Sequence, residues 1–191
     1  MIELLLVDDH AVVREGYRRL LERRPDLHVA AEAGDAEEAL QHLRAFPIDL
    51  IVLDLSLPGM GGIELTRRIL QRFPEAKILA FSMHRDPLFA SQALRAGALG
   101  YVTKSSTPET LIQAIYKVAR NEKVLSPDIA PEMALSLLEG DSNPADDLSP
   151  REFEVLRLLL GGQAVEEIAG ILNISPKTVQ NTHYQIKAKL G

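Results

Sequence analysis

The first 121 residues alternate between two hydrophobic patterns. Short aliphatic runs predict five buried parallel strands, at residues 2–7, 27–33, 49–54, 77–82 and 99–104. Amphipathic stretches predict five helices, at residues 14–24, 35–46, 62–73, 86–96 and 108–120. Strands that alternate with helices in this way are typical of an α/β fold, here a doubly wound five-stranded parallel sheet. We expect residues 1–121 to form this domain.

The remaining residues change in pattern twice. We interpret residues 122–147 as a linker, with a short helix within 126–140 and a flexible joint at "GDSNPADD" (140–147). Residues 148–191 are helical in pattern, with Ser149 and Ser175 as caps, each followed by proline at the first helical position. Two short helices joined by a tight turn, at 164–173 and 174–190, indicate a small all-α helix-turn-helix domain over 148–191.

Composition narrows the class of protein. The 191 residues are 46% hydrophobic and 25% charged, which is ordinary for a globular chain. There is no cysteine, which excludes disulfides, thiolate metal sites and a cysteine nucleophile and fits a cytoplasmic location. The first apolar run stops at two aspartates, so we expect neither a signal peptide nor a membrane span.

Charge is distributed unevenly. The net charge of −6 argues weakly against a nucleic-acid partner. Residues 173–191, however, hold three lysines (Lys177, Lys187, Lys189) and no acid, a local charge of +3. A local basic segment matters more for DNA binding than the sum over the chain.

Polar side chains end four of the predicted strands. Asp8 and Asp9 end the first strand, Asp54 the third, Ser82 the fourth and Lys104 the fifth. The carboxyl ends of parallel strands share one edge, where ligands bind. Crowded carboxylates repel one another, and oxygen ligands without cysteine or a histidine pair favour Mg²⁺ as the ion that relieves this. Lys104 suits a phosphate. Any single aspartate here is as readily a turn former, but five polar groups at matching strand ends are improbable by chance.

The stretches "LLLVDDH", "IVLDLSLPGMGG", "ILAFSMH" and "GALGYVTKS" resemble the receiver domain of two-component response regulators. The resemblance implies that Asp54 accepts a phosphoryl group from a histidine kinase. It also implies that Asp9, Asp54 and the backbone carbonyl of Ser56 ligate Mg²⁺, with Asp8 acting mainly through water. Lys104 and Ser82 would bind phosphoryl oxygens. Tyr101 would be an aromatic switch that turns inward as Ser82 moves toward the phosphate; the alternative is an edge-strand aromatic that only packs.

Residues 148–191 resemble the LuxR-type helix-turn-helix, and with the receiver they resemble a NarL/FixJ-type transcriptional response regulator. On a helical wheel, the last helix places Val179, His183, Ile186 and Leu190 on one face, which we expect to pack. By resemblance, Gln180, Asn181 and Tyr184 face the bases, and Lys177 and Lys187 reach phosphates. A solvated helix face is the alternative, and for Lys189 the two interpretations weigh equally.

Two departures from the LuxR pattern stand out. The stretch "TVQNT" has Gln180 where the family often has a charged residue and Thr182 where it often has histidine, which puts the DNA sequence in doubt. The chain ends where the family continues into a fourth helix, so we expect that helix to be lacking; whether by truncation or by nature stays open.

We therefore expect a phosphorylation-activated, DNA-binding transcriptional regulator and not an enzyme. Its expected partners are a sensor histidine kinase, double-stranded DNA and a second copy in a phosphorylation-dependent homodimer. One alternative is a phosphatase of the haloacid dehalogenase type, but Ser56 stands where that class has a second acid. Another is a phospho-dependent protein-interaction module with impaired DNA binding.

Overall fold

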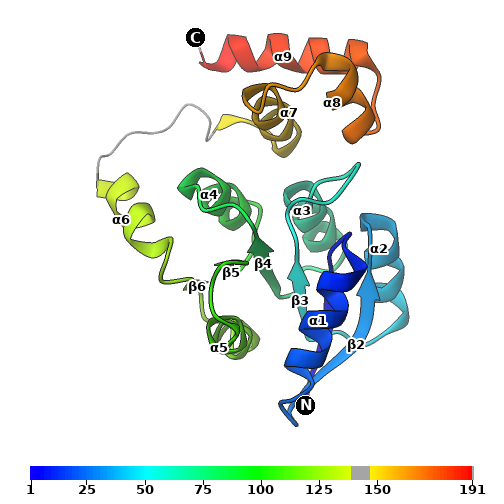
Figure 1. The fold of residues 1–191 in the computed structure, drawn as a ribbon, viewed down its shortest axis with the longest axis vertical. Helices are drawn as coiled ribbons and strands as arrows, with labels where there is room; N and C mark the ends of the chain where they lie inside the picture. The colour runs from blue at the N-terminus through cyan, green and yellow to red at the C-terminus, as the bar shows by residue number, and fades with distance from the viewer. Residues whose placement is uncertain (139–146, 191) are drawn as a thin grey trace.

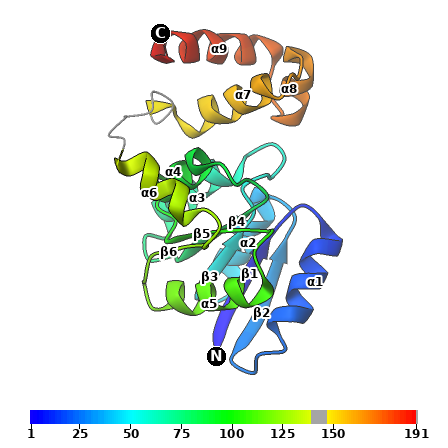
Figure 2. The same cartoon turned by 60° about the vertical axis from the view of Figure 1, so that its left-hand side comes forward.

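The computed structural model describes residues 1–138 and 147–190 (Figure 1). The joint expected at 140–147 lies, except for Asp147, outside this described part. The described part comprises a parallel sheet flanked by helices, a helix that leads away from it, and three helices that pack together (Figures 1 and 2). The predicted α/β fold with a small helical domain is confirmed.

The sheet has six parallel strands in the order β2-β1-β3-β4-β5-β6. Five match the predicted runs: β1 (Ile2–Val7), β2 (Leu27–Ala33), β3 (Leu50–Leu53), β4 (Ile78–Ser82) and β5 (Gly100–Thr103). The sixth, β6 (Val124–Leu125), was not predicted, because two residues make no hydrophobic period. Asn121, in the left-handed region at φ 62°, turns the chain back so that β6 pairs along β5. The segment expected to be linker therefore begins with an edge strand.

Five helices cover the two faces of the sheet. One face packs against α1 (Ala11–Leu21) and α5 (Pro108–Ala119), and the other against α2 (Ala36–Ala45), α3 (Gly62–Arg72) and α4 (Pro87–Arg95). Side chains cap two of these helices: Asp35 accepts from two backbone amides at the start of α2, and Thr107 accepts from one at the start of α5. The inner strands β3, β4 and β5 are thus buried on both sides, which explains why they lack polar alternation, whereas the edge strand β2 alternates between buried and more exposed positions.

Helix α6 (Ala130–Leu138) follows β6 and packs against α4 (Figure 2). The short helix predicted in this segment is therefore confirmed. The helical domain comprises α7 (Pro150–Leu160), α8 (Val165–Ile171) and α9 (Pro176–Leu190). Ser149 and Glu152 form a complete capping box at the start of α7, which fixes where that helix begins.

Candidate functional site

Ends of neighbouring strands bring three of the predicted pocket residues into contact. Asp8 follows β1, Asp54 follows β3 and Lys104 follows β5. Lys104 Nζ donates to Asp8 Oδ2 at 2.5 Å and to Asp54 Oδ2 at 2.7 Å. The pocket lies where the strand order reverses around β1, the place at which parallel sheets bind ligands.

The lysine of this pocket is held in its charged form. The side chains of Asp8, Asp54 and Lys104 are exposed by only 9%, 4% and 8%. Burial alone lowers the pKa of Lys104, but the hydrogen bonds to Asp54 and Asp8 outweigh burial, so the pKa is raised. The ammonium therefore offsets part of the repulsion between the two carboxylates.

The same edge offers ligands for a hard cation. Ligand atoms of Asp8, Asp9 and His10 all lie within 4.8 Å of one another, and His10 Nδ1 is 2.8 Å from Asp9 Oδ1. Asp54 contacts the same Lys104 ammonium as Asp8 does. Carboxylate oxygens in this number fit Mg²⁺ by their chemistry. Sequence reasoning missed His10, although it directly follows both acids in "VDDH".

A second group of contacts surrounds Ser82 and Tyr101. Ser82 is fully buried, and its Oγ accepts from the His84 amide at 3.3 Å. Tyr101 is also fully buried, and its hydroxyl donates to the His84 carbonyl at 2.8 Å. Burial raises the pKa of Tyr101 well above its ordinary value. The inward position expected of Tyr101 on phosphorylation is therefore already filled in this structure.

His84 also links the pocket to the helical domain. Its Nε2 lies 3.2 Å from Ser56 Oγ, and the Ser56 amide donates to Asp54 Oδ1 at 3.0 Å. The His84 ring stacks on Phe89 with a centroid distance of 3.9 Å. Phe89 in turn meets Phe153 of α7 edge-on at 4.8 Å. A chain of contacts thus runs from the aspartate to the helical domain.

Helix α9 presents a polar face to solvent. The residues expected to face DNA are all exposed, namely Lys177, Gln180, Asn181, Tyr184 and Lys187. Val179 and Ile186 are buried on the opposite face, as the helical wheel predicts. Thr182 is buried beside them and its Oγ1 donates back to the Thr178 carbonyl at 2.9 Å, whereas His183 is only half-buried.

Lys189 has partners within the domain. Its Nζ donates to Glu152 Oε2 at 2.7 Å and to the Asp147 carbonyl at 3.3 Å. The Glu152 side chain is only 8% exposed and belongs to the capping box of α7. Lys189 therefore ties the end of α9 to the start of α7, which favours a structural role for this lysine over a phosphate contact.

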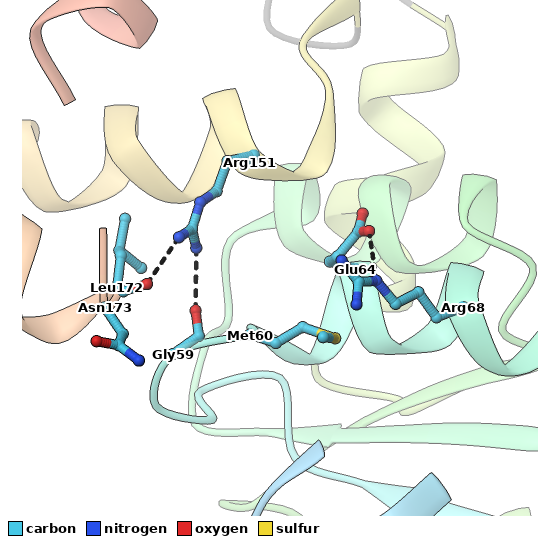
Figure 3. Close-up of a pocket in the computed structure, with 7 residues that line it drawn as sticks. All are labelled: Gly59, Met60, Glu64, Arg68, Arg151, Leu172 and Asn173. Carbon is cyan, nitrogen blue, oxygen red and sulfur yellow. Dashed lines mark hydrogen bonds and ion pairs between the residues drawn. The ribbon is translucent and has the colours of Figure 1, made fainter. Parts of the chain in front are cut away.

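The helical domain docks on the loop that follows Asp54 (Figure 3). Arg151 Nη1 donates to the Gly59 carbonyl at 3.0 Å and Arg151 Nη2 donates to the Leu172 carbonyl at 2.7 Å. The Gly59 amide donates to the Ile171 carbonyl at 3.0 Å. These groups border a groove of about 470 Å³ lined by Gly59, Met60, Glu64, Arg68, Arg151, Leu172 and Asn173.

Glu154 of α7 is buried in the same interface. Its Oε2 accepts from Arg151 Nη1 at 3.0 Å, while its buried Oε1 has no hydrogen-bond partner. Burial raises the pKa of Glu154, against the lowering effect of Arg151. Neither Arg151 nor Glu154 was expected at a domain contact, because an amphipathic helix pattern does not say what its polar face meets.

Comparison with known families assigns both parts of the chain. Residues 4–116 match the response regulator receiver domain, and residues 146–191 match the luxR family of bacterial regulatory proteins. The chain is similar over its full length to response regulator UvrY of Escherichia coli K12, with 38% identity over 193 residues and 88% of that protein covered.

Solved structures are similar to the chain as well. A LuxR-family two-component response regulator from Aurantimonas sp. SI85-9A1 shares 53% identity at a TM-score of 0.69, over 71% of this chain and 97% of that one. RcsB from Salmonella enterica serovar Typhimurium, bound to promoter P1flhDC with phosphomimetic BeF₃⁻, shares 30% identity at a TM-score of 0.74, over 100% of this chain and 92% of that one. Within residues 1–138 and 147–190, no helix is long and apolar enough to cross a membrane.

Proposed function

The chain belongs to the LuxR family of two-component response regulators, and we propose that Asp54 is the residue through which a histidine kinase activates its DNA binding. The receiver match and the similarity to a promoter-bound RcsB support a phospho-activated transcription regulator. Membership in this family argues against a metabolic enzyme. The observation that carries the assignment to Asp54 is the buried contact of Lys104 with both Asp54 and Asp8.

The proposed reaction moves a phosphoryl group from a phosphohistidine to Asp54. A carboxylate oxygen of Asp54 attacks phosphorus, the P–N bond breaks, and its electron pair returns to the imidazole of the donor. Lys104 then exchanges a carboxylate contact for a phosphoryl oxygen, which its mobile ammonium suits. Ser82 would bind a second phosphoryl oxygen.

Mg²⁺, when bound, offsets the charge of the acids and of the incoming phosphoryl group. Asp9, Asp54 and the carbonyl of Ser56 would hold the ion, and Asp8 would act through water. The Ser56 amide already fixes Asp54 Oδ1 at 3.0 Å, so this chain presents its other carboxylate oxygen to Lys104. The carboxylate is thus oriented before the phosphodonor arrives.

Phosphorylation should be read by the residues around Ser82. A phosphoryl group adds charge and three acceptor oxygens. If an element contacts these oxygens better in one of two conformations, phosphorylation shifts its population toward that conformation. The His84 amide donates to Ser82 Oγ, the His84 carbonyl accepts from the Tyr101 hydroxyl, and the His84 ring stacks on Phe89 of α4. A shift of Ser82 should therefore be transmitted to α4. We propose that this shift changes association of two copies of the receiver.

DNA would be read by the exposed face of α9. Gln180 and Asn181 carry amides that bond adenine edges, and Tyr184 lies one turn further along the same face. Lys177 and Lys187 would contact phosphates. We further propose residues 1–121 as the receiver, 122–147 as the linker and 148–191 as the DNA-binding domain, in a protein that acts in the cytoplasm.

Intact-mass measurement tests the assignment of the acceptor. After incubation with a small acyl phosphate and Mg²⁺, the protein should gain one phosphoryl group, and it should gain none without Mg²⁺. Asp54→Asn should abolish the gain, whereas the control Asp49→Asn, at an exposed acid before β3, should retain it. A gain by Asp54→Asn at the wild-type rate would refute the assignment.

Anisotropy with a selected site and a scrambled site tests the DNA face. Asn181→Ala should cost about 1–3 kcal/mol on the selected site alone if its amide makes a bidentate contact. Lys177→Ala should weaken both sites alike and reduce the salt dependence. Equal losses on both sites for Asn181→Ala would remove it from base readout.

A further inference from the structure

Asp128 lies where the receiver sheet passes into the linker. It follows β6 and stands two residues before α6, the helix that leads toward the helical domain (Figure 2). Its pKa is lowered, because hydrogen bonds from surrounding hydroxyl groups outweigh the opposing effect of its burial. Asp128 has no role in the phosphoryl transfer proposed for Asp54.

Three hydroxyl groups, one at the end of β5 and two in the loop after it, converge on this carboxylate. Thr103 Oγ1 donates to Asp128 Oδ2, Ser106 Oγ donates to Oδ1 at 3.2 Å, and Ser105 Oγ donates to Oδ2 at 3.4 Å. Thr103 and Ser105 flank Lys104, the cation of the phosphorylation pocket. Asp128 therefore holds the chain on both sides of Lys104.

The loop after β4 reaches the same carboxylate through Arg85. Arg85 Nε lies 3.7 Å from Asp128 Oδ2 and donates to Ser105 Oγ at 3.0 Å. Arg85 stands three residues after Ser82, the other proposed phosphoryl-binding residue. One carboxylate thus contacts both loops whose residues would move when a phosphoryl group enters.

The linker side of the contact is continuous with α6. The Ser126 amide donates to the Tyr101 carbonyl at 2.9 Å, and the amides of Ile129 and Ala130 both donate to the Ser126 carbonyl at 3.1 Å. Ile129 is fully buried. A displacement of Asp128 is therefore passed to the first turn of α6 through backbone hydrogen bonds and a packed side chain.

We propose that Asp128 is a positioning residue that couples the phosphoryl site to the linker. When Lys104 exchanges a carboxylate for a phosphoryl oxygen, the loop of residues 103–106 shifts, and the hydroxyl groups on Asp128 carry the shift to α6. The inference rests on the proposed function of Asp54 and Lys104. It requires that α6 and the phosphoryl site affect each other reciprocally, because coupling between binding equilibria is symmetric.

Hydrogen exchange tests this coupling in the full chain. Beryllofluoride with Mg²⁺ should change the exchange protection of the Ala130–Leu138 amides by about fivefold or more, the lower end of usual coupling. Asp128→Ala should remove this change, while the control Glu132→Gln, which removes a charge from the exposed side of α6, should keep it. Asp128→Asn retains an acceptor oxygen but loses the charge opposite Arg85, so its response should be intermediate.

Beryllofluoride affinity, measured by calorimetry, separates coupling from simple loosening of the linker. Asp128→Ala should change the affinity for beryllofluoride by the same factor by which it reduces the effect of beryllofluoride on exchange in α6. A merely structural role would leave the affinity unchanged. Ser106→Ala, which leaves the linker intact, should reduce both readouts. Full retention of the exchange response in Asp128→Ala, or unchanged affinity in it, overturns the proposal. Failure of the wild-type protein to bind beryllofluoride overturns the proposed function of Asp54 and this inference together.

Discussion

A single methyl group at Gly61 should release the helical domain from the receiver. A Cβ at this position would lie 1.4 Å from Glu154 Oε1 and 2.5 Å from its Cδ, so the Glu154 carboxylate must move before a methyl group fits. The backbone of Gly61 has φ −63° and ψ 159°, an extended conformation open to any residue. Gly61→Ala therefore disturbs the docked domain and not the start of α3.

The magnitude follows from what must move. Glu154 is held by Arg151, which also bonds the Gly59 and Leu172 carbonyls, so displacing the carboxylate loosens the whole contact. Overpacking of this kind costs about 1–3 kcal/mol. If the cost falls on docking alone, the docked population relative to the undocked one falls by about 5- to 150-fold. The free energy of unfolding of the receiver itself should be unchanged.

Energy transfer between two dyes measures the docked population. The chain has no cysteine, so Gln41→Cys and Gln185→Cys, at exposed positions of α2 and α9, accept labels selectively. Gly61→Ala should lower the mean transfer efficiency. Gly16→Ala is the control, because a Cβ there meets nothing within 4 Å.

A double-mutant cycle decides whether the clash is the cause. In a Glu154→Ala background the methyl group has room, so Gly61→Ala should have no further effect on docking. The clash with Glu154 is not what releases the domain if Gly61→Ala leaves the transfer efficiency unchanged, or if it lowers that efficiency equally with and without Glu154.

Three further predictions concern charged groups. The pKa of Glu154 is raised in the docked state, so docking of the wild-type protein should weaken as pH rises from the ordinary value of 4.5 to that raised pKa. Glu154→Gln should remove this pH dependence. A wild-type transfer efficiency that does not change with pH would contradict the prediction. Lys189→Met should lower the free energy of unfolding by up to about 1 kcal/mol at pH 7, since this lysine is 41% exposed. The pKa of its partner Glu152 is lowered, so the ion pair stabilises the fold above pH 4.5. The difference in unfolding free energy between wild type and Lys189→Met should therefore vanish as pH falls through the lowered pKa. A difference that persists in urea titrations at acid pH would contradict this. Lys104→Met should tighten Mg²⁺ binding in calorimetry, because the ammonium competes with the ion for the same carboxylates, and weaker binding would contradict that competition.

The middle of the sheet was predictable because β3, β4 and β5 are buried on both faces and have almost unbroken apolar sequences. Helix ends were predictable where a side chain caps them, as Asp35 does for α2. The start of α1 was placed three residues late, because its cap His10 makes no side-chain hydrogen bond and gives no capping signal. The strand β6 is set by pairing with β5, which two residues of sequence cannot reveal.

The meeting of Asp8, Asp54 and Lys104 was predictable from one rule, that parallel strands share a carboxyl edge. Asp8, Asp54 and Lys104 meet there although they are far apart in sequence. Arg151 and Asp128 follow no such rule. Their partners are backbone carbonyls and hydroxyl groups brought near by tertiary packing, which hydrophobic periodicity does not encode.

DNA affinity with and without beryllofluoride, measured by anisotropy on wild type and Asp54→Asn, shows whether phosphorylation of Asp54 activates DNA binding. Beryllofluoride with Mg²⁺ should tighten binding of the wild-type protein to its selected site and leave Asp54→Asn unchanged. Equal tightening in both proteins, or none in a wild-type protein that binds beryllofluoride, would contradict activation of DNA binding through Asp54.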